Sequence, residues 1–438
     1  MSRGVRGRPR TSAGPAARPR RRELPVFDAL RWIRRIHLLA GVSVGVLLVV
    51  AGLTGSALVY RAELDAWLHP ELLRVEPGPS RVPLDSIVAV VRAAYPDERP
   101  RSLQLARAPN ESHEVTFVGE DPLQVYVDPY TGRVLGARRE SETLPNLLFE
   151  IHTTLLAGET GEKVMGTAAL LLLVLVATGI VVWWPGLRGG ARRIWEACVV
   201  RRCANWRRIN FDLHRALGVW STVFLTVMAV TGASLAFSGT FMAGLNWMTR
   251  SPPRPAAPVV EPVPGAAPLP VDTLVRLADA VVPDGIPTYI TLPTAAGAPL
   301  VVRKKVPAEL HPNGRNFIYL HPQTGEVREV EDALQAPAGT RAYNVLYPVH
   351  IGRWGGWASK LVYAGLGLSP VILFISGCLM WWSRSGRRLW GRGAERLAAA
   401  SLLRDPGAPR RRRAAAAPQD ATTTGTPPSI PRASAGSR

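Results

Sequence analysis

Four histidines of this 438-residue chain stand at matched positions beside long apolar segments. His37 and His214 each precede a glycine by four residues and a Thr-Gly pair by a longer, identical interval. His152 and His350 each precede a glycine by six residues and a Trp-Trp pair further on. Neutral imidazole is a good axial ligand for iron, and two helices hold a haem when each supplies one inward-facing histidine. The pattern therefore predicts haem ligation by these four side chains.

The elements that position these histidines are four apolar stretches. About 20 helical residues cross the ~30 Å hydrocarbon core of a bilayer, and residues 37–60, 164–184, 216–237 and 361–382 meet that length without any Asp, Glu, Lys or Arg. Arginines cluster before the first stretch, between the second and third, and after the fourth. Because cationic loops stay in the cytoplasm, we expect a multi-pass protein of the bacterial inner membrane with both termini cytoplasmic. The first stretch is too long for a signal peptide and is interpreted as a retained helix.

This topology places the histidines at two depths. His37 and His214 lie at the cytoplasmic ends of their helices, whereas His152 and His350 precede their spans on the outer side. We therefore expect an inner haem between the first two and an outer haem between the others. The alternative is that interfacial histidines beside glycines only help helices to pack or extend toward headgroups. Cross-pairing of the two depths also stays open.

Several cationic residues flank the four histidines and could meet haem propionates. Arg34, Arg35 and Arg215 stand beside the inner pair, and Arg353, with Lys163 and Lys360, stands near the outer pair. Ordinary anchoring at the membrane interface is the competing interpretation for all of them.

The chain also repeats itself. His37-x3-Gly41 with Thr54-Gly55 returns as His214-x3-Gly218 with Thr231-Gly232. In the outer segments, residues 125–134 match residues 318–327 around an Asp-Pro-Tyr-Thr-Gly or His-Pro-Gln-Thr-Gly turn. Each outer segment is expected to contain an amphipathic helix, at about 86–94 and 273–281, capped by Asp85 or Ser86 and by Asp272 or Thr273. The predicted fold is a membrane all-α four-helix bundle, built as a duplicated helix–domain–helix, with two small α+β outer domains.

The predicted boundaries follow from these spans. They are a disordered basic cytoplasmic tail (1–30), the first transmembrane helix (31–60), the first outer domain (61–147), an interfacial segment with the second helix (148–185), an Arg-rich cytoplasmic loop (186–210), the third helix (211–238), a Pro-rich linker with the second outer domain (239–345), an interfacial segment with the fourth helix (346–384), and a disordered cytoplasmic tail (385–438).

The formal charge of +20 indicates an anionic binding partner, which could be a lipid bilayer or nucleic acid. Because the arginines flank apolar spans and are not interleaved with aromatic residues on a folded module, the expected partner is the lipid bilayer and not nucleic acid. The three cysteines suggest no disulfide framework. The remaining histidines, 69, 113, 311 and 321, lack metal-ligand spacing and are assigned surface or turn roles.

These features together resemble the PepSY-associated transmembrane family. The residues that carry the resemblance are Tyr126-Val-Asp-Pro-Tyr-Thr-Gly132 and its second copy, Leu213-His-Arg-x2-Gly218, Ile151-His152, Val349-His350 and the Gly-x3-Trp-Trp endings. The resemblance covers about residues 30–390. It implies PepSY-like outer domains, two b-type haems on His37, His152, His214 and His350, and the activity of an inner-membrane reductase that delivers electrons to a periplasmic ferric siderophore for iron uptake.

Two other functions stay open at this stage. One is a permease component for iron chelates, which the expected absence of charges and broken helices in the spans disfavours. The other is a haem-free, membrane-anchored PepSY module that binds or inhibits a protein. For the reductase, the sequence carries no glycine-rich nucleotide motif, so electrons are expected from quinol or a cytoplasmic donor.

Overall fold

A computed structural model describes residues 25–186, 190–201 and 203–383. The predicted tail at 385–438 and residues 1–24 of the predicted tail at 1–30 lie outside the described residues, whereas residues 25–30 are helical and begin the first helix. Between them the chain is mainly helical and contains one antiparallel sheet.

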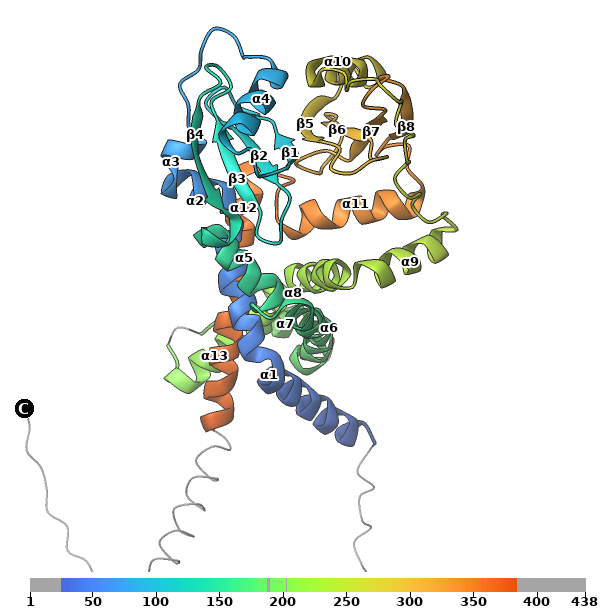
Figure 1. Cartoon of the computed structure of the whole chain (residues 1–438). Coiled ribbons are helices and arrows are strands. Elements are labelled where there is room, and N and C mark those ends of the chain that lie inside the picture. The colour runs from blue at the N-terminus through green and yellow to red at the C-terminus, as the bar shows by residue number, and fades with distance from the viewer. Residues whose placement is uncertain (1–24, 187–189, 202, 384–438) are drawn as a thin grey trace, which may run out of the picture. The chain divides into compact units, whose positions relative to one another are not determined.

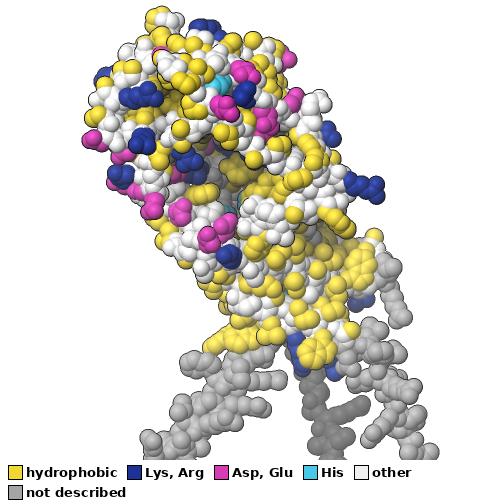
Figure 2. Space-filling model, turned by 45° about the vertical axis from the view of Figure 1, so that its right-hand side comes forward, with side chains coloured by type: hydrophobic (Ala, Val, Ile, Leu, Met, Phe, Trp, Pro, Cys, Tyr) yellow, Lys and Arg dark blue, Asp and Glu magenta, His cyan; other side chains and the backbone are white. Residues whose placement is uncertain are grey.

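Four apolar helical spans are present, as predicted. They are α1 (Pro25–Leu58), α6 (Gly158–Trp183), α8 (Trp206–Ala236) and the pair α12 (Gly356–Gly367) and α13 (Ser369–Trp381). Helices α1 and α8 each pack against α6 and α13, so α1 and α8 lie diagonally across the bundle (Figure 1). Figure 2 shows hydrophobic side chains over these helices, while charged side chains gather over the sheet.

The fourth span is interrupted, which corrects the expectation of four unbroken helices. Helix α12 ends at Gly367 and α13 begins at Ser369, with Leu368 between them. Pro370 follows closely, and because it has no N–H it cannot donate the helical hydrogen bond to the carbonyl oxygen of Leu366, four residues earlier. Gly52 of α1 packs at this interruption, because a Cβ there would lie 2.6 Å from the carbonyl oxygen of Gly367.

Short helices connect the spans to the outer part of the chain. They are α2 (Arg61–Leu68), α3 (Pro70–Leu73), the 3-10 turn η1 (Glu140–Glu142), α5 (Leu144–Thr154), α7 (Gly190–Cys198), α9 (Ser238–Thr249) and α11 (Ala338–His350). Helix α5 packs on α1 and α6, and α11 packs on α8 and α9. These two short helices matter most for function, because they carry His152 and His350.

The outer part of the chain is built on a single eight-stranded sheet of order β4-β3-β2-β1-β5-β6-β7-β8, with every neighbouring pair antiparallel. The strands are β1 (Pro100–Gln104), β2 (His113–Phe117), β3 (Leu123–Val127), β4 (Val134–Arg139), β5 (Ile286–Thr291), β6 (Leu300–Lys305), β7 (Asn316–Leu320) and β8 (Val327–Glu331). The two segments expected as separate domains are thus joined through β1 and β5, where Leu103 lies opposite Ile290.

One face of the sheet is covered by α4 (Leu84–Ala94) and α10 (Val271–Val281) (Figure 1). The core there contains Ile87 and Val91 of α4, Leu274 of α10, and strand residues such as Leu103 and Ile290. Because strand side chains alternate between faces, polar residues of the same strands point to the other face. That second face is the one that carries Gln104, Tyr289, Arg303 and Lys305.

The two covering helices cap each other. The carboxylate of Asp85 accepts hydrogen bonds from the backbone N–H of Val271 and Asp272, and the carboxylate of Asp272 accepts from Leu84 and Asp85. Helix α4 begins at Leu84 and α10 at Val271, so the prediction that Asp85 or Ser86, and Asp272 or Thr273, are N-caps of their own helices is wrong. The two aspartates instead satisfy the free N–H groups of the opposite helix.

The two copies of the repeated turn use different side chains for the same purpose. In the first copy, Asp128 accepts hydrogen bonds from the backbone N–H groups of Tyr130 and Thr131. In the second copy, His321 Nδ1 accepts from Gln323 and Thr324 at the equivalent places. The replacement of aspartate by histidine therefore leaves the turn intact, and His321 has the turn role predicted for it.

Candidate metal centre with two histidine pairs

The inner pair brings together α1 and α8 across the bundle. The imidazole rings of His37 and His214 lie 6.4 Å apart between centroids, with their planes at 88°. Each ring meets a hydroxyl of a neighbouring span: Nδ1 of His37 lies 2.9 Å from Oγ1 of Thr178 in α6, and Nδ1 of His214 lies 2.9 Å from Oγ of Ser376 in α13. The pairing of His37 with His214, which the sequence predicts, is the pairing that the structure has.

The outer pair has the same design with the roles of the elements exchanged. His152 of α5 and His350 of α11 have ring centroids 6.2 Å apart and planes at 54°. Nδ1 of His152 lies 2.9 Å from Oγ1 of Thr54 in α1, and Nδ1 of His350 lies 2.8 Å from Oγ1 of Thr231 in α8. Helices α1 and α8 thus supply histidines to the inner pair and hydroxyls to the outer pair.

The hydroxyls decide which ring nitrogen carries the proton. Each of them donates its own proton to the backbone carbonyl four residues earlier, at 2.6 or 2.7 Å; the four donors are Thr54, Thr178, Thr231 and Ser376. A hydroxyl that donates to the backbone can only accept from imidazole, so each Nδ1 carries the hydrogen. The lone pair of each neutral ring is then on Nε2, which is the atom available to a metal.

A glycine follows each of these hydroxyl residues and lies against the same ring. A Cβ at Gly55, Gly179, Gly232 or Gly377 would come within 3.0–3.4 Å of the Cε1 atom of the histidine beside it. A side chain there would displace the ring, so each Ser/Thr-Gly pair forms a fitted seat for one imidazole. Sequence reasoning noted the repeated Thr-Gly pairs and Gly179 and Gly377, but it missed Thr178 and Ser376. The signal was a Ser/Thr-Gly pair in every span.

The two pairs fit a bis-histidine haem on three counts. Two metal–nitrogen bonds of about 2 Å, plus about 1.2 Å from each nitrogen to its ring centroid, give a centroid separation of roughly 6.3 Å, close to the 6.4 and 6.2 Å observed. Among the described residues, none of the four Nε2 atoms has a hydrogen-bond partner. No third His, Cys, Asp or Glu in this part of the chain joins either pair, whereas zinc sites take three or four protein ligands.

The arginines singled out from the sequence have varied surroundings. Arg34 and Arg35 are exposed, and Arg35 lies over the ring of Trp32. Arg215 donates to the carbonyl oxygen of Glu196 and pairs with the fully buried carboxylate of Asp212. Contact with haem propionates stays a prediction for all of these residues.

Arg353 and the two lysines lie toward the end of the bundle that carries His152 and His350. Arg353 follows His350 by three residues, and its backbone N–H donates to the carbonyl oxygen of Pro348. Lys360 pairs with Glu63 of α2, and Lys163 makes an exposed ion pair with Glu159. The lysines are therefore engaged by carboxylates, and a role for Arg353 toward a propionate stays a prediction.

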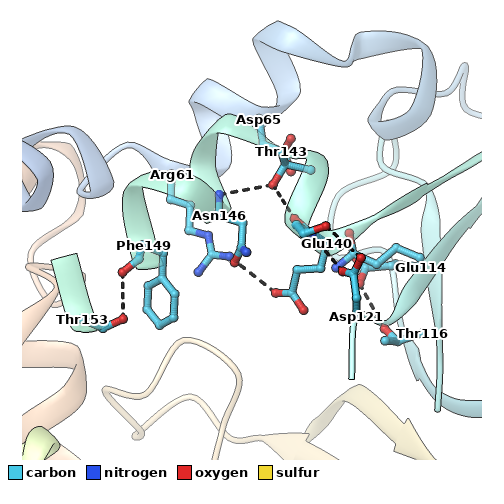
Figure 3. Close-up of polar contacts among 12 residues, drawn as sticks. Arg61, Asp65, Glu114, Thr116, Asp121, Glu140, Thr143, Asn146, Phe149 and Thr153 are labelled. Atoms are coloured by element: carbon cyan, nitrogen blue, oxygen red, sulfur yellow. Dashed lines mark hydrogen bonds and ion pairs between the residues drawn. The ribbon is translucent and has the colours of Figure 1, made fainter. Parts of the chain in front are cut away.

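The start of α5, which presents His152, is fixed by polar contacts with the first outer segment (Figure 3). The hydroxyl of Thr143 caps the helix by accepting from the backbone N–H of Asn146 at 3.2 Å. Arg61 of α2 lies over the ring of Phe149 and 3.9 Å from Glu140. These contacts tie the helix that carries an outer histidine to the elements that begin the sheet domain.

Two cavities lie on opposite faces of the sheet. The larger, about 790 Å³, is lined by α4, α10 and the Pro-rich segment, on the face away from the polar strand residues. The smaller, about 220 Å³, lies on the polar face and is lined by residues that include Arg101, Tyr289 and Arg303. Only the smaller one shares a residue with the surroundings of α11, because Arg303 also reaches His311 beside that helix.

The family model for the PepSY-associated TM region matches residues 34–384. The chain belongs to this family. The match begins just before His37 and ends just after the fourth span, so it includes all four paired histidines of this PepSY-associated TM protein.

The chain is also similar to an uncharacterized protein of Pseudomonas aeruginosa. The two are 25% identical over 263 residues, which is 55% of this PepSY-associated TM chain and 63% of the relative. The match therefore spans less than two thirds of that relative's length.

Proposed function

We propose that this protein is a haem-containing oxidoreductase of the bacterial inner membrane that passes electrons outward to a periplasmic ferric acceptor of the siderophore type. The observation that carries the proposal is the arrangement of the four histidines. Two pairs, one between α1 and α8 and the other between α5 and α11, have centroid separations of 6.4 and 6.2 Å, and the hydroxyl contacts at Nδ1 leave the lone pair of each ring on Nε2.

Each histidine has a defined task in this proposal. His37 and His214 would hold the inner haem, and His152 and His350 the outer haem. Bound there, haem b would supply a one-electron carrier with no open iron position, which suits electron transfer better than oxygen chemistry. Thr54, Thr178, Thr231 and Ser376 would keep the rings in one tautomer and one orientation, so the ligand nitrogens would need no rearrangement.

The proposed orientation puts the electron donor on the cytoplasmic side of the bundle and the electron acceptor on the periplasmic side. Quinol or a cytoplasmic protein is the proposed donor. A ferric chelate is the proposed acceptor, because reduction weakens the hold of hard oxygen ligands on iron and releases it for uptake. We also infer that the chain arose by internal duplication, which would explain why α1 and α8 have equivalent histidines and equivalent hydroxyls.

The first experiment is a dithionite-minus-oxidised visible spectrum of the detergent-purified protein with a haem-to-protein ratio. We expect a b-type spectrum with about two haems per chain, because each pair supplies two imidazoles. In the variant His214→Ala the ratio should fall to about one, since only the inner pair is broken.

His69→Ala is the control, because His69 belongs to neither pair and lies beside Glu71 instead. It should keep the full haem ratio. A colourless protein from haem-replete cells would contradict the proposal and would favour a membrane-anchored PepSY module that binds another protein.

A further inference from the structure

Five cations gather on the polar face of the sheet beside α11: Arg107, Arg303, Lys305, Arg315 and Arg353. We call them the basic cluster. Arg303 and Lys305 come from β6, Arg315 directly precedes β7, Arg107 follows β1, and Arg353 follows α11. Segments far apart in the sequence therefore bring like charges together. Repulsion between these like charges destabilises the fold, and a bound anion would relieve that repulsion.

Hydrogen bonds hold three of these cations without neutralising them. Arg303 donates to the carbonyl oxygen of Gly314, Lys305 to those of Glu309 and His311, and Arg107 to that of Pro312. Among the described residues, none of the five lies within ion-pair distance of a carboxylate. Carbonyl oxygens fix the geometry of a guanidinium or ammonium group but leave its full charge.

Within the described residues, the carboxylates near the basic cluster accept hydrogen bonds from backbone N–H groups and an asparagine, and not from the cationic side chains. Glu309 accepts from the backbone N–H groups of Val306 and Arg315 and from the side chain of Asn316. Glu111 accepts from the backbone of Arg107 and Ala108. The Nε atom of Arg315 is buried and has no hydrogen-bond partner. The cluster therefore has a surplus of positive charge and an unused donor.

The protonation of His311 reflects this surplus. Burial, and then the charges of Arg303, Arg315, Lys305 and Arg107, lower the pKa of His311 to about 3. His311 is neutral at physiological pH for that reason, and its Nδ1 accepts from the backbone N–H of Asn313. The four cations thus act together at one place.

Two features connect the basic cluster with the outer histidine pair: a ring contact made by His311, and the positions of Tyr347 and Arg353 in the sequence. The ring of His311 stacks on Tyr347 of α11 at 5.3 Å between centroids. Tyr347 and Arg353 stand three residues before and after His350. An anion bound here would therefore sit beside the helix that presents an outer ligand.

We propose that the basic cluster is a binding site for an anionic, oxygen-rich metal chelate, with Arg303 and Lys305 as its main contacts and the 220 Å³ cavity beside Arg303 as part of the site. The choice of a metal chelate rests on the proposed function, since an external acceptor has to bind near the outer haem. The site selects the charge class of the acceptor: chelates with carboxylate or phenolate oxygens bind, and neutral chelates do not.

The test is a calorimetric titration of the full chain, in nanodiscs of neutral phosphatidylcholine, with gallium(III) citrate, which is anionic and redox-inert. We expect binding that weakens as salt is added, and an affinity lower by at least about tenfold in Arg303→Gln/Lys305→Gln, because two charge-assisted contacts are lost. Arg92→Gln/Arg276→Gln removes two exposed arginines from α4 and α10 on the other face and should bind as the unmodified protein does.

A second variant guards against misfolding. No hydrogen bond of the Arg353 side chain is found among the described residues, so Arg353→Gln should fold normally and still weaken binding severalfold. Equal binding of a neutral gallium trihydroxamate, unchanged affinity in both cluster variants, or displacement of the chelate by phosphatidylglycerol would overturn the proposal; the last result would assign the cluster to a lipid headgroup. The haem spectrum of the same samples separates the two proposals, because gallium binding needs no haem.

Discussion

At the scale of single residues, the hydroxyls distinguish the four paired histidines from histidines that only fill a helix interface. A histidine that merely fills an interface needs no fixed tautomer. Here all four rings have the same one, because Thr54, Thr178, Thr231 and Ser376 each donate to their own helix and can only accept from Nδ1. Partners of this kind orient a ligand and make its free nitrogen more basic.

Thr231→Val tests this role on the outer pair. Valine has nearly the same shape but leaves Nδ1–H of His350 without an acceptor, which costs about 1–3 kcal/mol at a buried site. Haem retention by the outer pair should fall about 10- to 100-fold, measured as the haem ratio during competition with apomyoglobin. Thr226→Val is the control, since the Thr226 hydroxyl donates to the carbonyl oxygen of Thr222 in its own helix and, within the described part of the chain, contacts no histidine. Equal behaviour of the two variants would show that the hydroxyl is not a partner of the ligand.

The sequence predicts which histidines belong to the site but not which hydroxyl residues orient their rings. His37, His214, His152 and His350 stand out because their spacing to glycines and tryptophans recurs. Thr178 and Ser376 do not stand out, because hydroxyl residues are ordinary in apolar helices and bond to their own backbone. Their role depends on which helix lies opposite, and the order of packing in the bundle is not written in any local pattern.

At the scale of elements, the reciprocal caps explain why the two outer segments form one unit. Asp85 and Asp272 each bind two backbone N–H groups at the start of the opposite helix. Together with the pairing of β1 with β5, they join the two halves on both the helix layer and the strand layer. Sequence reasoning placed these aspartates at helix starts but could not foresee the exchange, because a cap from a distant helix has no sequence spacing.

Asp272→Asn should destabilise the outer part by about 0.5–2 kcal/mol, because one cap acceptor and a charge favourable to a helix N-terminus are lost. Burial would raise the pKa of Asp272, but hydrogen bonds from the N–H groups of Asp85 and Leu84 outweigh it and lower the pKa from its ordinary value. The contribution of this carboxylate is therefore complete above its unfolded pKa of about 3.9 and is lost as the pH falls through the folded value.

The measurement is the melting temperature of the detergent-purified protein at pH 7 and in acid. The gap between the unmodified protein and Asp272→Asn should be clear at pH 7 and should narrow below about pH 4. Asp284→Asn, at an exposed acid of the same outer segment, should melt as the unmodified protein does at both pH values. A gap that widens in acid would contradict the sign of the pKa shift.

At the scale of the whole molecule, the sequence predicts the number and position of the membrane spans better than it predicts single contacts. Four uncharged stretches, with arginine clusters before the first, between the second and third and after the fourth, are enough to predict four spans, and the four apolar helices are confirmed. Length and hydropathy do not foresee the interruption at Leu368, since Pro370 can kink a helix or end it. Nor do they show that the two outer segments share a sheet, because strand pairing between β1 and β5 joins residues almost 190 positions apart.

The expected topology can be tested with a native residue. Cys203 is exposed and lies in the Arg-rich segment between α6 and α8, which positive charge should keep in the cytoplasm. A membrane-impermeant maleimide should therefore leave the protein unlabelled in intact spheroplasts and label it in inverted vesicles. Cys198→Ser/Cys203→Ser is the negative control, because Cys198 is partly exposed in the same segment. An added cysteine, Ala295→Cys on that double-serine background, should give the opposite result, because it lies in the segment between α8 and the fourth span. Labelling of Cys203 in intact spheroplasts would reverse the orientation, and with it the direction in which this protein is proposed to carry electrons.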